Sequence, residues 1–261
     1  MTAEEYKDAM DIVAQDPHLL PGIYNFCDQW CDRCNNQDRC FTFRMRKLTG
    51  RVQENNDPDD NQWIEDVEAA FGATRLILEE EFEKMGITMD ETKEDTEQIA
   101  VMMAKSPYKT GDWPEYITEA QTYGFDVLKW LSTNKEIISD NLVPMISISD
   151  EEAEKINYAL ETIQRYALVI QGKMRMAYSA RVEVNDFDRT GYANGQMKTG
   201  IEIVEKSIQS MLVLLEVLPS QETEILNFLQ SLSFILKEAN QMYPDATGFD
   251  FDKYCRDMEI E

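Results

Sequence analysis

Histidine and long apolar runs are nearly missing from this chain, and each absence excludes a class of function. The one histidine, His18, lies between prolines in DPHLLP. A di-iron bundle of the usual kind needs several histidines, as does a zinc enzyme with paired histidine ligands. A single histidine in a turn also gives no geometry for a Ser-His-Asp or Cys-His centre. No run of eighteen apolar residues exists, so the sequence predicts no membrane-spanning helix.

Positive charge is scarce as well. The chain has 50 acidic against 25 basic residues and a net charge of −25, and its one short basic cluster is RMRK at 44–47. Nucleic-acid binding depends on cations that neutralise phosphates, so this balance disfavours nucleic acids and anionic membranes. The excess charge is explained either by solubility or, more specifically, by a face that docks a basic protein partner.

Strand patterns are absent, whereas helical patterns recur along the whole chain, so the predicted fold class is all-α. Thr2 and Glu5 form a capping-box start for a first helix, which Pro17 and Pro21 end. A second helix is predicted from Trp63 to Gly86. Its apolar face consists of Ile64, Val67, Phe71, Thr74, Leu78, Phe82 and Met85. A short helix is expected around IAVMMA at 99–104, and a longer one from Pro114 to Asp140.

The second half of the chain shows three consecutive apolar stripes with a mean spacing of 3.5 residues. They run over 156–177, 197–218 and 225–243, and Asn194 is a candidate cap for the second. Such stripes joined by short turns predict antiparallel helices packed at shallow angles. The predicted architecture is an antiparallel helical bundle with a cysteine-bearing N-terminal segment. Its expected parts are 1–53, 61–146, 147–243 and a tail at 244–261, integrated in one domain.

Four of the five cysteines lie in CDQWCDRCNNQDRC at 27–40. If this segment were helical, Cys27, Cys31 and Cys34 would share one face, and Cys40 could fold back to join them. The acidic N-terminus lacks the features of a signal peptide, so we expect a cytoplasmic location, where thiols stay reduced and disulfides are disfavoured. Four thiols this close together predict a metal site with all four cysteines as ligands.

The compact spacing favours an iron–sulfur cluster, [4Fe–4S], over Zn²⁺, because structural zinc sites usually draw cysteine pairs from separate knuckles. Zinc and a metal-free segment remain the alternatives. Arg33 and Arg39 each precede a cysteine and are either cations that tune a cluster or ordinary surface residues. Trp30 and Phe26 either shield a cluster or anchor the core. Cys255 stands alone.

Cys31, Cys34 and Cys40 follow a C-x2-C-x5-C spacing that resembles the last three cluster ligands of the endonuclease III type of DNA glycosylase. The first gap differs, so only the idea of cluster ligation is carried over. The C-x3-C-x2-C spacing equals that of radical-SAM enzymes, but a fourth cysteine and the lack of strands disfavour that chemistry. The loop at 185–197 lacks the final Glu of a calcium-binding EF-hand, and GYANGQMKT lacks the Gly-Lys-Thr of a phosphate loop.

Three motifs together resemble a Bacteroidota-type family of bacterial helical proteins without an assigned activity. They are NFCDQWCDRC with its later cysteine, NGQMKTGIEIVEKSI, and MYPDATGF. The resemblance implies a cytoplasmic four-cysteine helical protein and no substrate. The leading hypothesis is therefore a closed [4Fe–4S] centre with an electron-transfer, redox-sensing or structural role. The alternative is an acidic helical scaffold for protein–protein interaction, zinc-stabilised or metal-free, and an enzyme with an unrecognised carboxylate site is the third hypothesis.

Overall fold

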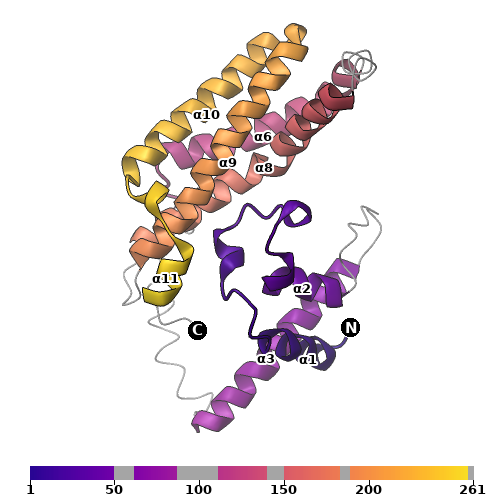
Figure 1. Ribbon diagram of the computed structural model, residues 1–261, viewed down its shortest axis with the longest axis vertical. Coiled ribbons are helices and arrows are strands. Elements are labelled where there is room, and N and C mark those ends of the chain that lie inside the picture. The colour runs from indigo at the N-terminus through magenta and orange to yellow at the C-terminus, as the bar shows by residue number, and fades with distance from the viewer. Residues whose placement is uncertain (50–61, 87–110, 140–149, 183–188, 258–261) are drawn as a thin grey trace. The chain divides into compact units, whose positions relative to one another are not determined.

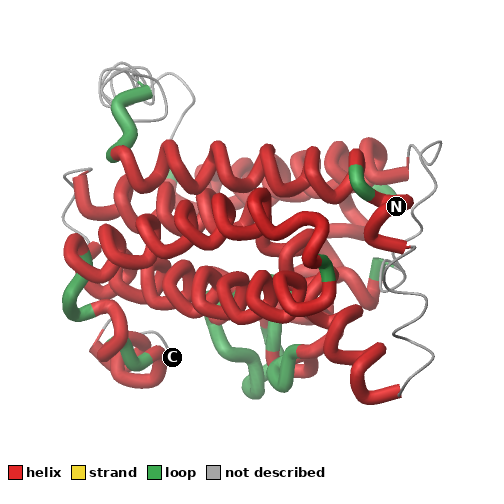
Figure 2. The backbone as a smooth tube through the Cα atoms, turned by 90° about the horizontal axis from the view of Figure 1, so that it is seen from above, coloured by secondary structure: helices red, strands yellow, loops and turns green. Residues whose placement is uncertain are grey.

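A computed structural model describes residues 1–49, 62–86, 111–139, 150–182 and 189–257. Helices and turns account for the secondary structure in these ranges, without a strand, which confirms the all-α class (Figure 2). The chain divides into two compact units, Met1–Lys105 with Glu261, and Ser106–Ile260. The predicted helix at 99–104 lies outside the described residues. Among the described helices, none is long and apolar enough to cross a membrane.

The second unit is a four-helix bundle built from α6 (Glu115–Thr133), α8 (Asp150–Val182), α9 (Arg189–Val217) and α10 (Glu222–Met242). The helices contact one another in a ring, because α6 packs on α8, α8 on α9, α9 on α10 and α10 on α6 (Figure 1). The three predicted stripes belong to α8, α9 and α10, and α6 supplies the fourth wall of the core.

Most members of the predicted stripes are buried in the core of this bundle, whereas Leu160, Ile208, Leu215, Leu229 and Leu236 are half-buried. Fully buried side chains from each helix include Ile117, Ile163, Ile170, Met174, Met197, Met211, Leu214 and Leu232. The predicted cap at Asn194 is wrong: α9 begins at Arg189, so Asn194 lies in its interior. The helix predicted over 114–140 is interrupted at Asn134, where α6 has its C-terminal cap. Its side-chain amide donates to the Trp130 carbonyl at 2.9 Å, which satisfies one carbonyl of the last turn.

The first unit contains α1 (Ala3–Ala14), α2 (Phe41–Leu48) and α3 (Gln62–Met85). The predicted capping box is confirmed, since Thr2 Oγ1 accepts from the Glu5 N–H at 3.2 Å and Glu5 Oε2 accepts from the Thr2 N–H at 2.9 Å. Ala9, Val13 and Met45 form the buried contact between α1 and α2.

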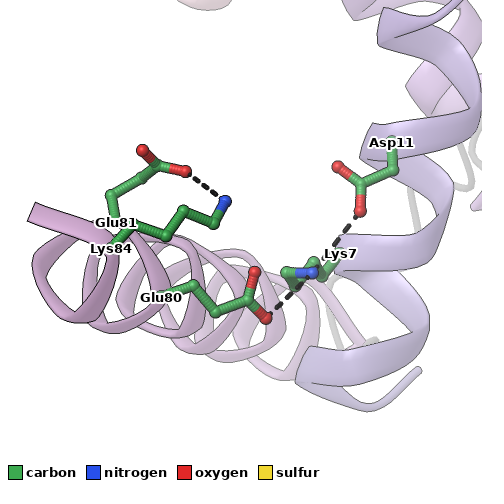
Figure 3. Close-up of polar contacts among 5 residues, drawn as sticks. All are labelled: Lys7, Asp11, Glu80, Glu81 and Lys84. Atoms are coloured by element: carbon green, nitrogen blue, oxygen red, sulfur yellow. Dashed lines mark hydrogen bonds and ion pairs between the residues drawn. The ribbon is translucent and has the colours of Figure 1, made fainter.

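α1 also packs on α3, and a charged link accompanies this contact. Lys7 of α1 lies between Asp11 of its own helix, at 3.5 Å, and Glu80 of α3, at 3.1 Å (Figure 3). The hydrogen bond that Lys7 donates to Glu80 raises the pKa of Lys7 above its ordinary value, and the charges of both carboxylates add to that shift against the opposing effect of burial. The Lys7–Glu80 pair therefore joins the two helices across their contact.

Gly124 lies where two bundle helices approach closely. A Cβ atom at this position of α6 would lie 2.3 Å from the Ala167 carbonyl oxygen of α8. The neighbour is backbone, which cannot move aside by a rotamer change. By contrast, a Cβ at Gly172 of α8 would meet nothing within 4 Å. Gly124 therefore leaves no room for a larger side chain, whereas Gly172 does.

We therefore expect Gly124→Ala to destabilise the protein and Gly172→Ala to stabilise it. Alanine favours a helix over glycine by about 1 kcal/mol, which Gly172→Ala should gain. At Gly124 the clash should outweigh that gain and cost about 1–3 kcal/mol, as overpacking usually does. Urea denaturation followed by circular dichroism measures both. Equal stability of the two variants would contradict the proposed helix contact.

Candidate metal site

The segment with the four cysteines is not an α-helix, so the prediction of three cysteines on one helical face is wrong. It forms three 3₁₀ turns, Ile23–Phe26, Cys31–Arg33 and Gln37–Arg39. The carboxylate of Asp28 accepts from the Trp30 N–H at 3.0 Å, and Gln29 adopts a left-handed conformation with φ 61°. A side chain that bonds to the backbone two residues later competes with helix formation. These two residues therefore interrupt any helix between Cys27 and Cys31.

Each of the four cysteines begins one of the three turns or directly follows one. Cys27, Cys34 and Cys40 each follow directly after one of the turns, with extended backbone, and Cys31 begins the second turn. The N–H of Cys34 donates to the Cys31 carbonyl at 3.1 Å, and the N–H of Cys40 donates to Gln37 at 3.2 Å. Each thiol is therefore carried by a tight turn and not by a regular helix.

All four cysteines line one pocket. Its volume is about 140 Å³, and aromatic rings form much of the remaining wall. The other lining residues are Ile23, Tyr24, Phe26, Asp28, Gln29, Trp30, Asn36, Gln37 and Phe43. Cys40 and Trp30 are buried, at 8% and 6% exposure. The structure thus brings together the four predicted site residues, and Phe26 and Trp30 with them.

Polar groups fix the cysteine backbone and sulfurs. The Asn36 N–H donates to Cys34 Sγ at 3.3 Å, and Cys27 Sγ donates to the Tyr24 carbonyl at 3.3 Å. The Gln37 side-chain amide donates to the Cys31 carbonyl at 2.6 Å. All four thiols are free of disulfides. As they stand, no set of three or more His, Cys, Asp or Glu side chains in the described ranges is arranged to hold a metal ion.

The cation that acts on the Cys31 thiol is one that the sequence patterns did not indicate. Burial raises the pKa of the Cys31 thiol, Arg46 opposes this shift by charge and hydrogen bonding, and Cys40 and Cys34 add to it. Arg33, in contrast, stacks on the Trp30 ring at 4.3 Å, and Arg39 Nε donates to the His18 carbonyl at 3.1 Å. The basic cluster RMRK was the available signal for Arg46.

A loop before the cysteines is tied to them and to α2. Arg44 of α2 forms an ion pair with Asp16, and the Leu20 N–H donates to the Arg39 carbonyl at 2.9 Å. The His18 N–H and Arg44 both lower the pKa of Asp16. The only histidine thus supports the segment through its backbone.

We expect the raised pKa of Cys31 to show in its alkylation. The thiolate is the reactive form, so a raised pKa moves the rate profile to higher pH. In reduced, metal-free protein, the midpoint of the iodoacetamide pH–rate profile of Cys31 should lie higher than in the urea-unfolded chain. Mass spectrometry of the modified peptide measures it. Coincident profiles would show that burial does not act on this thiol.

No family model matches the chain, and neither a curated protein nor a solved structure matches it.

Proposed function

We propose that the protein binds one [4Fe–4S] cluster through Cys27, Cys31, Cys34 and Cys40. The observation that carries this proposal is that all four thiols line a single pocket. Thiolate sulfur is the ligand that iron–sulfur clusters take from proteins. The N–H donor on Cys34 Sγ and the guanidinium of Arg46 near Cys31 are groups of the kind that stabilise the negative charge of such a centre.

The size of the pocket favours a cluster over a single zinc ion. A water molecule needs about 10–15 Å³ of such space, so about 140 Å³ admits a group of several atoms. A zinc ion binds its sulfurs at about 2.3 Å and leaves no free space between them. Either centre requires the thiols to move inward, and segments of short turns permit this more readily than a helix would.

The role that fits this ligand set is electron transfer, redox sensing or structural support. With a thiolate on every iron, no open coordination site remains for a substrate, so an enzymatic role does not follow. The aromatic wall would limit solvent access, which tunes the potential of a cluster. We place the protein in a reducing compartment such as the cytoplasm, because its cysteines are free. Membership of the Bacteroidota-type family remains a prediction.

The first test is the metal content of protein purified without oxygen. We expect a coloured protein whose visible absorption bleaches on reduction, with about four irons and four sulfides per chain. A colourless protein with one zinc per chain would replace the cluster by the alternative, a zinc-stabilised acidic scaffold. A protein with none of these metals would refute the proposed site altogether.

The second test assigns the ligands. Cys31→Ser should remove nearly all bound iron, whereas Cys255→Ser should leave it unchanged, because Cys255 does not line the pocket. Iron analysis of both variants after anaerobic purification measures this. Retention of the full iron content in Cys31→Ser would contradict the assignment. Circular dichroism and the melting temperature of the same variant show whether the centre is structural.

A further inference from the structure

Five bulky apolar side chains of α3 are exposed to solvent, whereas Leu76, Ile77 and Phe82 are half-buried. The exposed fractions of the five range from 41% to 73%, and Phe71 is the most exposed of them. The set, called the outer stripe from here on, is Ile64, Val67, Phe71, Leu78 and Met85. Its members were predicted to share one helix face, and the helical bounds of α3 confirm that they do. That face is not the one that packs on α1.

The small residues of α3 make the contact with α1. Ala69 and Ala73 are buried, at 5% and 0% exposure. A Cβ at Gly72 would lie 2.7 Å from the Ala3 Cβ of α1, so the two helices approach closely there. α3 is therefore apolar on two sides, and α1 packs on the side with small residues. A row of large apolar groups left in water is a feature of interaction surfaces.

The helix that carries the outer stripe is negatively charged. α3 contains seven acidic and two basic residues, a net charge of −5. Both basic side chains are already paired within the helix, Arg75 with Glu79 and Lys84 with Glu81, each at 2.7 Å (Figure 3 shows the second pair). Over the ranges that the structure describes, the exposed carboxylate of Glu68 forms no ion pair, and its helical position flanks the stripe. The surface thus offers an unpaired carboxylate next to the apolar anchors.

We propose that the outer stripe of α3 binds a basic amphipathic helix of a partner protein. Ile64, Phe71, Leu78 and Met85 are spaced seven residues apart, which is the repeat by which two helices pack along a common seam. From Ile64 to Met85 the stripe is about 32 Å long, which matches a helix of about 20 residues. Helix recognition of this kind rests on apolar anchors at such spacings.

Charge favours a basic helix over two other occupants of the stripe, a second copy of the chain and an anionic lipid surface. A second copy of the chain would bring another α3 with a net charge of −5 against the first, and like charges beside a seam oppose pairing. An anionic lipid surface would be repelled for the same reason. A helix with lysine or arginine beside its apolar face complements the stripe, the carboxylate of Glu68 and the net negative charge of α3. This inference is independent of the metal site.

The experiment uses the full chain and a fluorescent synthetic peptide of about 20 residues, with leucine at the seam positions and lysine beside them. Fluorescence anisotropy should show saturable binding that weakens with added salt, since exposed charges are screened. The double variant Phe71→Ser, Leu78→Ser should bind at least tenfold more weakly. The matched control, Leu212→Ser with Leu226→Ser, removes two side chains that are each 47% exposed on the bundle and should bind like the original chain.

A second variant tests the charges without touching the stripe. Glu68→Lys should also weaken the lysine peptide, and should strengthen a peptide with glutamate in place of lysine. Circular dichroism checks that all variants are folded. The proposal is overturned if the original chain does not bind, if Phe71→Ser, Leu78→Ser and Glu68→Lys all leave binding undiminished, or if a scrambled peptide binds equally well. Light scattering that shows a dimer which Phe71→Ser, Leu78→Ser dissociates would assign the stripe to a second copy instead.

Discussion

The candidate site depends on one local competition, between α-helix formation and the hydrogen bond from the Trp30 N–H to the Asp28 carboxylate. A continuous helix would place Cys27, Cys31 and Cys34 along a line, with successive thiols one turn apart. The interruption at Asp28 and Gln29 replaces this line by short turns that wrap the segment around a pocket. Cys27, Cys34 and Cys40 follow the turns in extended backbone and Cys31 begins one, and all four residues line the same pocket. The pocket is therefore a consequence of the turns.

The bundle was predictable from sequence because its signal is long and redundant. Ile156, Ile163 and Ile170 repeat through many helical turns, and each of them is fully buried. The cysteine segment offers no such periodicity, and three or four residues decide each of its turns. Asn194 failed as a cap because a good capping residue inside a helix costs little when the neighbouring turns are well packed. Tertiary contacts override a preference of this size.

Arg46 and α3 illustrate a second limit of sequence reasoning. Arg33 and Arg39 were candidates because each precedes a cysteine in the sequence. The cation that acts on Cys31 is instead Arg46 of α2. In α3 the pattern located the large apolar face correctly, but it could not show which face is packed. Two helices approach most closely where their side chains are small, so Gly72 and the alanines take the contact with α1. The larger residues on the opposite side are left exposed.

Electrostatic interactions link the cysteine segment of the N-terminal unit to α2. Thiolates that hold a metal centre concentrate negative charge, and this chain already carries a net charge of −25. In α2, which contains three basic residues and no acidic one, Arg46 acts on the Cys31 thiol, whereas Arg44 pairs with Asp16. Cys40 is the N-cap of the same helix. One short basic helix thus begins directly after one cysteine and brings a guanidinium to another. The basic cluster of this acidic sequence therefore belongs to the helix that follows the cysteine segment.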